Sequence, residues 1–590
     1  MATGTTTYED VKNHSALEHV DTRDDGSTHD EKVQLEQKKT LSEIDVENKA
    51  AYKGDDSDGS VDWSWRNIVA SIFLCMLYTG SQIILYFVGG SLQFIVPDLH
   101  AEATAVWLPV ANTLAIAAVA PYTGYLQDLF GKRYIALFGA LLICVGIILV
   151  GVCKDFGTAV AGMALAGAGA GIGELTGLAG ISEIVPVKHR GYSIAALTAF
   201  VFVFTPYIFY CQLLGSPEFG VANWRWIAWI SLIYNGITGI GLLVFYHPHN
   251  HTRAAGFSYG TILKKIDYVG GLLSIIGLTL FLVALQAGGY THPWTSAYVL
   301  CCLLIGLALL AGWVVWEAKF AAYPMVPGAL FKGQRIVALA YATAFVGGMF
   351  FYSALNFLPT TWADVYPNDP IQIGLKGLPP AISTTIGAIF FNAMLSTFPK
   401  NSREVLLTGA VIMTAFGGAL ATMTPDNPKT TVAIATMACF GLGGMIVPTA
   451  SVALLVAPDA LITTAAALSL SVRTVGGAIG YSIYFNVFVN KLTKYIPTYA
   501  AEYAVKAGLP LADAEVFVGT LLTEPTKIAS VPGFSAQVLA AAQVGIRWAY
   551  ADALHYVWYT SIPFGIAAIV CCLFLGSTAK YQTNRVAVAL

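Results

Sequence analysis

Charged residues are scarce in this chain, and their scarcity excludes most classes of soluble protein. Asp, Glu, Lys and Arg make up 11% of the 590 residues, while hydrophobic residues make up 56%. The mean hydropathy is +0.64. An ordinary soluble protein is about one quarter charged. The composition therefore predicts an all-α polytopic membrane protein, because membrane helices satisfy their own backbone hydrogen bonds.

The motifs of soluble enzymes are missing as well. The sequence has no phosphate-binding Gly-x-x-x-x-Gly-Lys-Ser/Thr, no dinucleotide fingerprint after a strand and no nucleophile elbow. We therefore expect no enzyme, no cofactor and no nucleic-acid partner. Without an ATP site, pumping would be driven by an ion gradient, while passive facilitation stays open.

Paired metal or disulfide spacings are also lacking. Of nine cysteines, eight lie within apolar stretches, where cysteine acts as a small hydrophobic residue. His247, His249 and His251 alternate along a basic loop, and we expect them to be solvated rather than to bind a metal. The sequence predicts no metal site.

Residues 1–62 lack any apolar run, and they differ in charge from the rest of the chain. They hold 16 Asp or Glu and 7 Lys or Arg residues, a net charge of -9, whereas the remaining chain has a net charge of +6. This composition predicts a disordered acidic cytosolic tail. Two interpretations stay open, namely a site of phosphorylation or ubiquitin-dependent turnover and a solvated leader without a specific partner.

Long hydrophobic runs are abundant. A helix needs about 20 apolar residues to cross a bilayer, and about fourteen such stretches can be placed in the sequence. They lie near residues 67–91, 103–126, 133–153, 157–182, 191–214, 225–246, 267–288, 297–317, 335–359, 371–394, 404–423, 430–456, 461–489 and 553–577.

These stretches form a pattern of six, two and six. It predicts an N-terminal bundle over residues 63–246, linker loops with two inserted helices over 247–334, and a C-terminal bundle over 335–577. The longest connection after the tail, residues 490–550, is expected to be extracellular and to form short helices over the outer mouth. Residues 578–590 are expected to be a cytosolic C-terminus.

The orientation follows from the basic residues. With both termini in the cytosol, the inner loops hold most of the Lys and Arg residues between spans, as the positive-inside rule requires. The Asn-X-Ser/Thr sequons at Asn13 and Asn250 then fall on the cytosolic side, where glycosylation does not occur. We expect a multi-pass protein of the plasma membrane, with the vacuolar membrane as the alternative.

A charged turn joins the second and third stretches. It contains Gly124, Asp128, Gly131, Lys132 and Arg133. Its carboxylate could cap the positive N-terminus of a neighbouring helix or pair with Arg133. We interpret the turn as one side of an inner gate, while the alternative is that these charges only fix the topology.

The fourth stretch carries an acid deep within the membrane. Glu174 lies about 13 Å from the inner end marked by Glu183. A carboxyl group at that depth could take up and release a proton as water access alternates, or it could be a packing contact. Glu183 and Arg190 lie at the end of this helix and in the next loop, so we expect them to pair with the Lys132/Arg133 turn and join the gate.

One base lies within an apolar stretch of the second half. Arg473 needs an acidic partner, and Asp128 and Glu174 are the plausible groups. It could serve the substrate or proton path, or it could form a structural ion pair. The glycines that follow it would allow close packing or a hinge; they are Gly476, Gly477 and Gly480.

Several motifs resemble one transporter family. The Gly124–Arg133 turn resembles the signature loop of the major facilitator superfamily, while the Asp267–Gly271 motif, the Leu285–Gly289 motif with Trp294 and fourteen spans look like its drug:proton antiporter branch. More narrowly, four segments are similar to the fungal trichothecene efflux pump family, which is close to siderophore–iron transporters; they are Tyr86–Gln93, Trp107–Asn112, Gly169–Thr176 and Ser182–Pro186.

The resemblance implies a function. It implies an alternating-access transporter that exports a hydrophobic toxin, drug or secondary metabolite in exchange for protons, working in the lipid bilayer and, we expect, as a monomer. The first span has no acid where many drug antiporters have one, which leaves Glu174 as the candidate proton carrier. The alternatives are proton-coupled import of a ferric siderophore and, in a different class, a non-transporting nutrient sensor.

Overall fold

The computed structural model describes most of the chain beyond the acidic tail. Residues 1–60 and 62, which cover nearly all of the predicted tail, lie outside the described residues, as do Asn13, Asn250, His249 and His251. The described residues are 61, 63–101, 104–105, 107–216, 223–248, 264, 266–289, 291–321, 323–331, 335–366, 369–523 and 525–587.

The described chain is almost entirely helical, with one isolated β-bridge. The helices of the first half are α2 (Trp65–Gly90), α3 (Leu92–Asp98), α4 (Trp107–Phe130), α5 (Lys132–Val152), α6 (Phe156–Ile184), α7 (Arg190–Ala199), α8 (Tyr207–Gly215) and α9 (Trp226–Phe245). The rest are α11 (Tyr268–Ala287), α12 (Ala297–Lys319), α13 (Arg335–Thr360), α14 (Pro370–Thr397), α15 (Ser402–Ala419), α16 (Pro428–Ile446), α17 (Pro448–Val456), α18 (Ile462–Lys506), α19 (Ala514–Thr523) and α20 (Ala536–Leu573).

The span count agrees with the sequence. Among the described residues, 13 helical segments are long and apolar enough to cross a membrane. Helix α4 is less apolar because it carries polar residues such as Asn112 and Gln127, but its 24 residues pack against α6 and α18. With α4 as a further span, each of the fourteen predicted stretches coincides with one helical segment.

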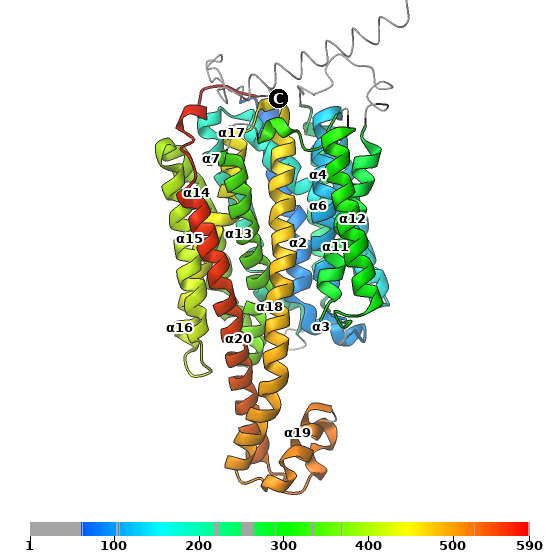
Figure 1. Ribbon diagram of the computed structural model, residues 1–590, viewed down its shortest axis with the longest axis vertical. Helices are drawn as coiled ribbons and strands as arrows, with labels where there is room; N and C mark the ends of the chain where they lie inside the picture. Colours follow the sequence, from blue (N-terminus) through cyan, green and yellow to red (C-terminus); the bar gives the residue numbers. More distant parts are fainter. Residues whose placement is uncertain are drawn as a thin grey trace, which may run out of the picture. The chain divides into compact units, whose positions relative to one another are not determined.

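By their contacts the spans fall into a first half, from α2 to α9, a second half, from α13 to α20, and the pair α11 and α12 between them in the sequence (Figure 1). In the first half α6 packs against α2, α4 and α5, and in the second half α18 packs against α13 and α20. The pair α11 and α12 lies at the side, with α11 against α4 and α18. Small residues bring backbones close, since a Cβ on Gly146 of α5 would lie 2.4 Å from the Ala166 nitrogen of α6.

The two ends of the bundle are named here after the predicted orientation. The end that carries the Gly124–Arg133 turn is called the inner end, and the opposite end is called the outer end. The halves meet where α4 packs against α18 and where α7 and α8 pack against α14. The contacts at a site that lies between the halves would therefore change when the halves move relative to one another.

The outer loop differs from the expectation. In place of short helices over the mouth, α18 and α20 continue past the other helices as long rods of 45 and 38 residues, with α19 at their far end (Figure 1). The Ala-rich sequence explains this, because alanine favours helix and lets the rods pack closely. Pro510 and Pro525 do interrupt the helices, but only at this tip.

An ion pair joins three segments at the outer end. Asp98, at the end of α3, accepts hydrogen bonds from the Trp224 indole at 3.0 Å and from the Arg225 guanidinium at 2.8 Å. Arg225 also donates to the Cys153 carbonyl at 3.0 Å. Burial acts to raise the pKa of Asp98, but the hydrogen bonds from Trp224 and Arg225 outweigh it and lower the pKa below its usual value.

This pair predicts a small, pH-dependent stabilisation. Because Asp98 has a depressed pKa when folded, its contribution is complete above about pH 4 and is lost as the pH falls below that value. The carboxylate is 44% exposed, so Asp98→Asn should lower the melting temperature of the purified protein by only about 1–2 °C at pH 7. Melting curves at pH 7 and pH 3 test this, since a variant effect as large at pH 3 as at pH 7 would contradict it.

Candidate functional site

The charged turn brings α4 close to the second half. Gly131 has φ of 87°, a left-handed conformation that favours glycine, and it lets α5 start directly after α4. Gly124 faces α18, since a Cβ there would lie 2.4 Å from the Ala467 side chain and 3.2 Å from the Thr463 carbonyl. Gly131 therefore permits the sharp turn, and Gly124 permits the close approach of α18.

Asp128 caps a helix of the opposite half. Its carboxylate accepts hydrogen bonds from the Thr464 hydroxyl and, at 3.0 Å, from the Thr464 backbone N–H in the first turn of α18. Of the two partners that the sequence left open, a helix N-terminus and Arg133, the structure shows the helix N-terminus. Arg133 instead donates to the Leu243 carbonyl of α9 at 3.0 Å.

Lys132 and Glu183 form a buried ion pair within the first half. Their side chains are 8% and 5% exposed. The pair links the start of α5 to the end of α6, so the expected contact between Glu183 and the turn is present. The contact braces the turn against α6 but does not itself cross between the halves.

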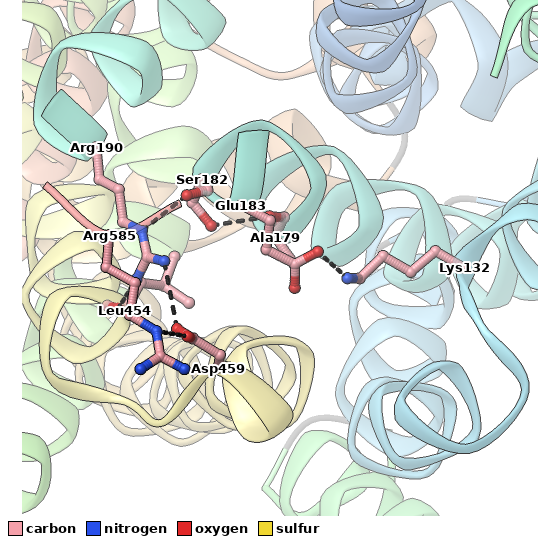
Figure 2. A network of polar contacts seen from close by, with 8 residues as sticks. All are labelled: Lys132, Ala179, Ser182, Glu183, Arg190, Leu454, Asp459 and Arg585. Carbon is pink, nitrogen blue, oxygen red and sulfur yellow. Dashed lines mark hydrogen bonds and ion pairs between the residues drawn. The ribbon is translucent and has the colours of Figure 1, made fainter. Parts of the chain in front are cut away.

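Arg190 does not pair with the turn, and that expectation was wrong. Its fully buried guanidinium donates from Nε to the Ser182 carbonyl at 2.7 Å and from one terminal nitrogen to the Leu454 carbonyl at 2.8 Å (Figure 2). Asp459 lies 3.7 Å from the other terminal nitrogen. Since α7 begins at Arg190 and runs along α14, the side chain points across to the second half.

Arg190, Asp128 and their partners thus join the two halves at the inner end. Ser182 belongs to the first half, whereas Leu454, Asp459 and Thr464 belong to the second. An arginine that bridges two backbone carbonyls is hard to replace, because its planar fork fixes both bonds at once. Directed polar contacts therefore hold the two halves together at this end.

The deep acid and the deep base form an ion pair across the halves. Glu174 of α6 and Arg473 of α18 are in contact, with side chains 6% and 9% exposed. Glu174 lies about 15 Å from the inner end of α6 and Arg473 about 16 Å from the inner end of α18. Of the partners that the sequence left open for Arg473, the structure shows Glu174.

This ion pair lies on a cavity between the halves. Glu174 and Arg473 share the wall of this cavity with Tyr78, Gln82 and Tyr352. Arg473 also has a buried Nε with no hydrogen-bond partner.

A second, more apolar cavity adjoins the first. Among the described residues, its wall includes Tyr207, Leu358, Trp362 and Cys439 but no charged residue. The two cavities share the lining residues Tyr86, Val201, Phe351, Thr384 and Thr385. We call the two together the central chamber, which combines an apolar subsite with a charged one.

Helix breaks occur in the walls of this chamber. The fifth span is interrupted between α7 and α8, where Pro206 follows a 3-10 turn over Phe200–Val203. Proline also lies inside α13 at Pro359 and inside α14 at Pro379 and Pro380. Such breaks shape the wall, because each proline removes a backbone donor and bends the helix.

The glycines after Arg473 pack α18 against α13. A Cβ on Gly476 would lie 2.1 Å from the Phe345 carbonyl, on Gly477 2.0 Å from the Tyr352 ring, and on Gly480 2.6 Å from the Met349 side chain. Gly348 of α13 faces them, since its Cβ would lie 1.9 Å from the Arg473 carbonyl. Close packing is therefore what these glycines permit.

Sequence reasoning missed several members of the site. Asp459 lies directly after Pro458 in a short interspan loop, where an acid opposite Arg190 could have been suspected. Tyr78 and Tyr352 looked like ordinary span aromatics, and only the fold places them beside Glu174 and Arg473. Among the described residues, no group of three or more His, Cys, Asp or Glu side chains could hold a metal.

Comparison with known proteins identifies one matching family model and several similar transporters. The family model described as the fungal trichothecene efflux pump (TRI12) matches residues 58–590. The MFS-type transporter prx5 of Penicillium rubens is 29% identical over 504 residues, covering 81% of this chain and 89% of that protein. The MFS-type efflux transporter ffsH of Aspergillus flavipes is 25% identical, covering 81% of this chain and 82% of its own.

Solved structures agree on the fold. The major facilitator proton:xylose symporter XylE has a TM-score of 0.51 to this chain at 12% identity. The match covers 88% of this chain and 97% of the symporter. At that identity the similarity shows the architecture, not the cargo.

Proposed function

Because the chain belongs to the fungal trichothecene efflux pump family of major facilitator transporters, we propose that it exports a hydrophobic toxin, drug or secondary metabolite in exchange for protons. Its architecture is that of a multi-pass membrane transporter. The proposal extends to export across the plasma membrane by a monomer. Relatives described as efflux transporters support the direction of transport.

The observation that carries the proposal is the Glu174–Arg473 ion pair. It joins α6 of one half to α18 of the other inside the central chamber. Protonation of Glu174 would remove its charge and weaken this contact between the halves. A proton at Glu174 would therefore favour separation of the halves at the chamber, and loss of the proton would restore the contact.

The chamber also supports the substrate class. Its apolar subsite presents Tyr207, Leu358 and Trp362, and its polar groups include the hydroxyls of Thr205, Thr384, Thr385 and the tyrosines. Pockets of this kind bind molecules that are mostly apolar with a few hydrogen-bonding groups. A hydrophobic, hydroxyl-bearing metabolite fits that lining better than a strongly charged ligand would.

Transport into proteoliposomes tests the proposal. We expect a labelled trichothecene-like toxin to accumulate in vesicles that are acidic inside, and to equilibrate without accumulating when the pH gradient is collapsed. A labelled ferric siderophore serves as the second substrate in vesicles that are acidic outside, because proton-coupled import predicts that this molecule accumulates together with the entering protons. Accumulation of the siderophore alone, or toxin uptake that ignores the pH gradient, would refute proton-coupled export.

A further inference from the structure

The end of the chain returns to the inner gate. After α20 ends at Leu573, the Ser577 hydroxyl donates to the Lys400 carbonyl and the Thr578 N–H donates to the Ser402 hydroxyl, both at 3.1 Å. The Tyr581 side chain is buried, and the Gln582 amide donates to the Leu395 carbonyl at 3.2 Å. These contacts fix the segment to α14 and α15 of the second half.

The same segment then pairs with the first half. The backbone N–H of Val187 donates to the Arg585 carbonyl and that of Lys188 donates to the Thr583 carbonyl, both at 3.1 Å. Val187 and Lys188 belong to the turn between α6 and α7, directly before Arg190. Residues 577–587, which we call the C-terminal strap, therefore touch both halves of the transporter.

The Arg585 side chain of the strap adds a further contact to the inner gate. Arg585 donates from Nε to Asp459 at 2.7 Å, and Asp459 also faces the buried Arg190 (Figure 2). The side chains of Arg585 and Asp459 are only 26% and 19% exposed. The Asp459 carboxylate therefore contacts both Arg190 of the first half and Arg585 of the strap. This shared contact links the strap to the polar contacts that join the halves at the inner end.

We propose that the C-terminal strap is a latch that holds the inner gate closed and must detach from the first half before the transporter can open inward. Opening separates the turn at Val187 and Lys188 from Asp459, which lies in the 3-10 turn directly before α18. The strap is bonded to both sides, so its bonds to one side have to break. The latch adds stability to the closed state without contacting the central chamber.

Labelling of a gate residue tests the latch in the full-length protein. Thr463 is fully buried in the gate, so Thr463→Cys, labelled with a membrane-impermeant maleimide in inside-out vesicles, reports inward opening. The rate is measured against the same chain with Thr463, which accounts for the native cysteines. Truncation after Gln582 removes the strap's bonds to the first half, whereas truncation after Ala587 retains all of them.

We expect truncation after Gln582, and to a lesser degree Arg585→Ala, to raise the labelling rate. A rise of about tenfold corresponds to roughly 1.4 kcal/mol of lost stabilisation of the closed state. Truncation after Ala587 should leave the rate unchanged. Equal rates in both truncated proteins, each with the melting temperature of the parent, would overturn the latch.

A crosslink supplies an independent readout. Lys188→Cys combined with Thr583→Cys places two thiols on residues whose backbones are hydrogen-bonded. Oxidation should slow transport at least tenfold, and reduction should restore it, because the locked strap cannot release the first half. Crosslinked protein that transports at the rate of its reduced form would also overturn the proposal.

Discussion

Replacing Glu174 with Gln is expected to abolish proton-driven accumulation while leaving substrate exchange in place. Glutamine retains the size and polarity of the side chain but cannot carry a proton. We expect accumulation driven by a pH gradient to fall at least tenfold, and exchange of labelled for unlabelled substrate without a gradient to stay within about threefold. The two rates are measured in the same proteoliposomes.

The control variants test whether the effect of Glu174→Gln arises from leaving its partner, Arg473, without a negative charge. In the single variant Arg473 remains buried without its acid, which is costly in a low-dielectric interior. The double variant Glu174→Gln/Arg473→Gln removes both charges and should recover stability but not coupling. Glu183→Gln removes another buried acid of α6 and should retain coupling. If Glu174→Gln accumulated substrate as the parent does, Glu174 would not be the proton carrier.

Replacing Arg190 with Ala is expected to open the inner gate. The substitution leaves the Ser182 and Leu454 carbonyls without their donor and takes one arginine from Asp459. Breaking a buried charged contact of this kind costs about 3–5 kcal/mol. We expect maleimide labelling of Thr463→Cys from the inner side to rise by about 100-fold or more. Arg190→Lys should be intermediate, because a lysine cannot hold both carbonyls in one plane.

A matched arginine at the other end separates the gate from general stability. Arg225 also pairs with an acid and a carbonyl, but it lies at the outer end and its side chain is 29% exposed. Arg225→Ala should therefore leave labelling of Thr463→Cys within about twofold of the parent. If Arg225→Ala and Arg190→Ala raised labelling equally, Arg190 would not have a specific role in closing the inner end.

Much of the fold could be predicted from the sequence, because membrane helices are dictated by local composition. All fourteen predicted stretches coincide with helical segments, since a run of about 20 apolar residues has few alternatives in a bilayer. The outer segment of residues 490–550 was harder. Its composition shows helix propensity, but whether a helix continues a span or starts afresh depends on packing between α18 and α20.

The contacts of the site were only partly predictable. A deep acid and a deep base require partners, so a Glu174–Arg473 contact could be listed among the options from their depth alone. Arg190 was assigned to the wrong partners because the nearest charges in the predicted topology were those of the turn. Its true partners include two backbone carbonyls, and no sequence pattern marks a carbonyl as an acceptor for a distant arginine.

The contacts of the chain end could not be inferred from the sequence. Residues 578–590 show no motif, and the contacts of Gln582, Thr583 and Arg585 depend on where α20 ends in the fold. The contacts of Asp459 were hidden for the same reason, because Arg190 and Arg585 lie more than 100 residues from it in the sequence and meet it only in the fold. Long-range convergence of this kind is set by the tertiary fold.

The most direct test of proton exchange at Glu174 records pH inside proteoliposomes. Vesicles loaded with a trichothecene-like toxin and a pH-sensitive dye are diluted into toxin-free buffer at equal pH, so that the substrate gradient alone drives transport. Proton-coupled export by antiport predicts that the lumen acidifies as toxin leaves, and that Glu174→Gln shows no such change. Alkalinisation, no pH change in the parent, or equal acidification in Glu174→Gln would contradict the account.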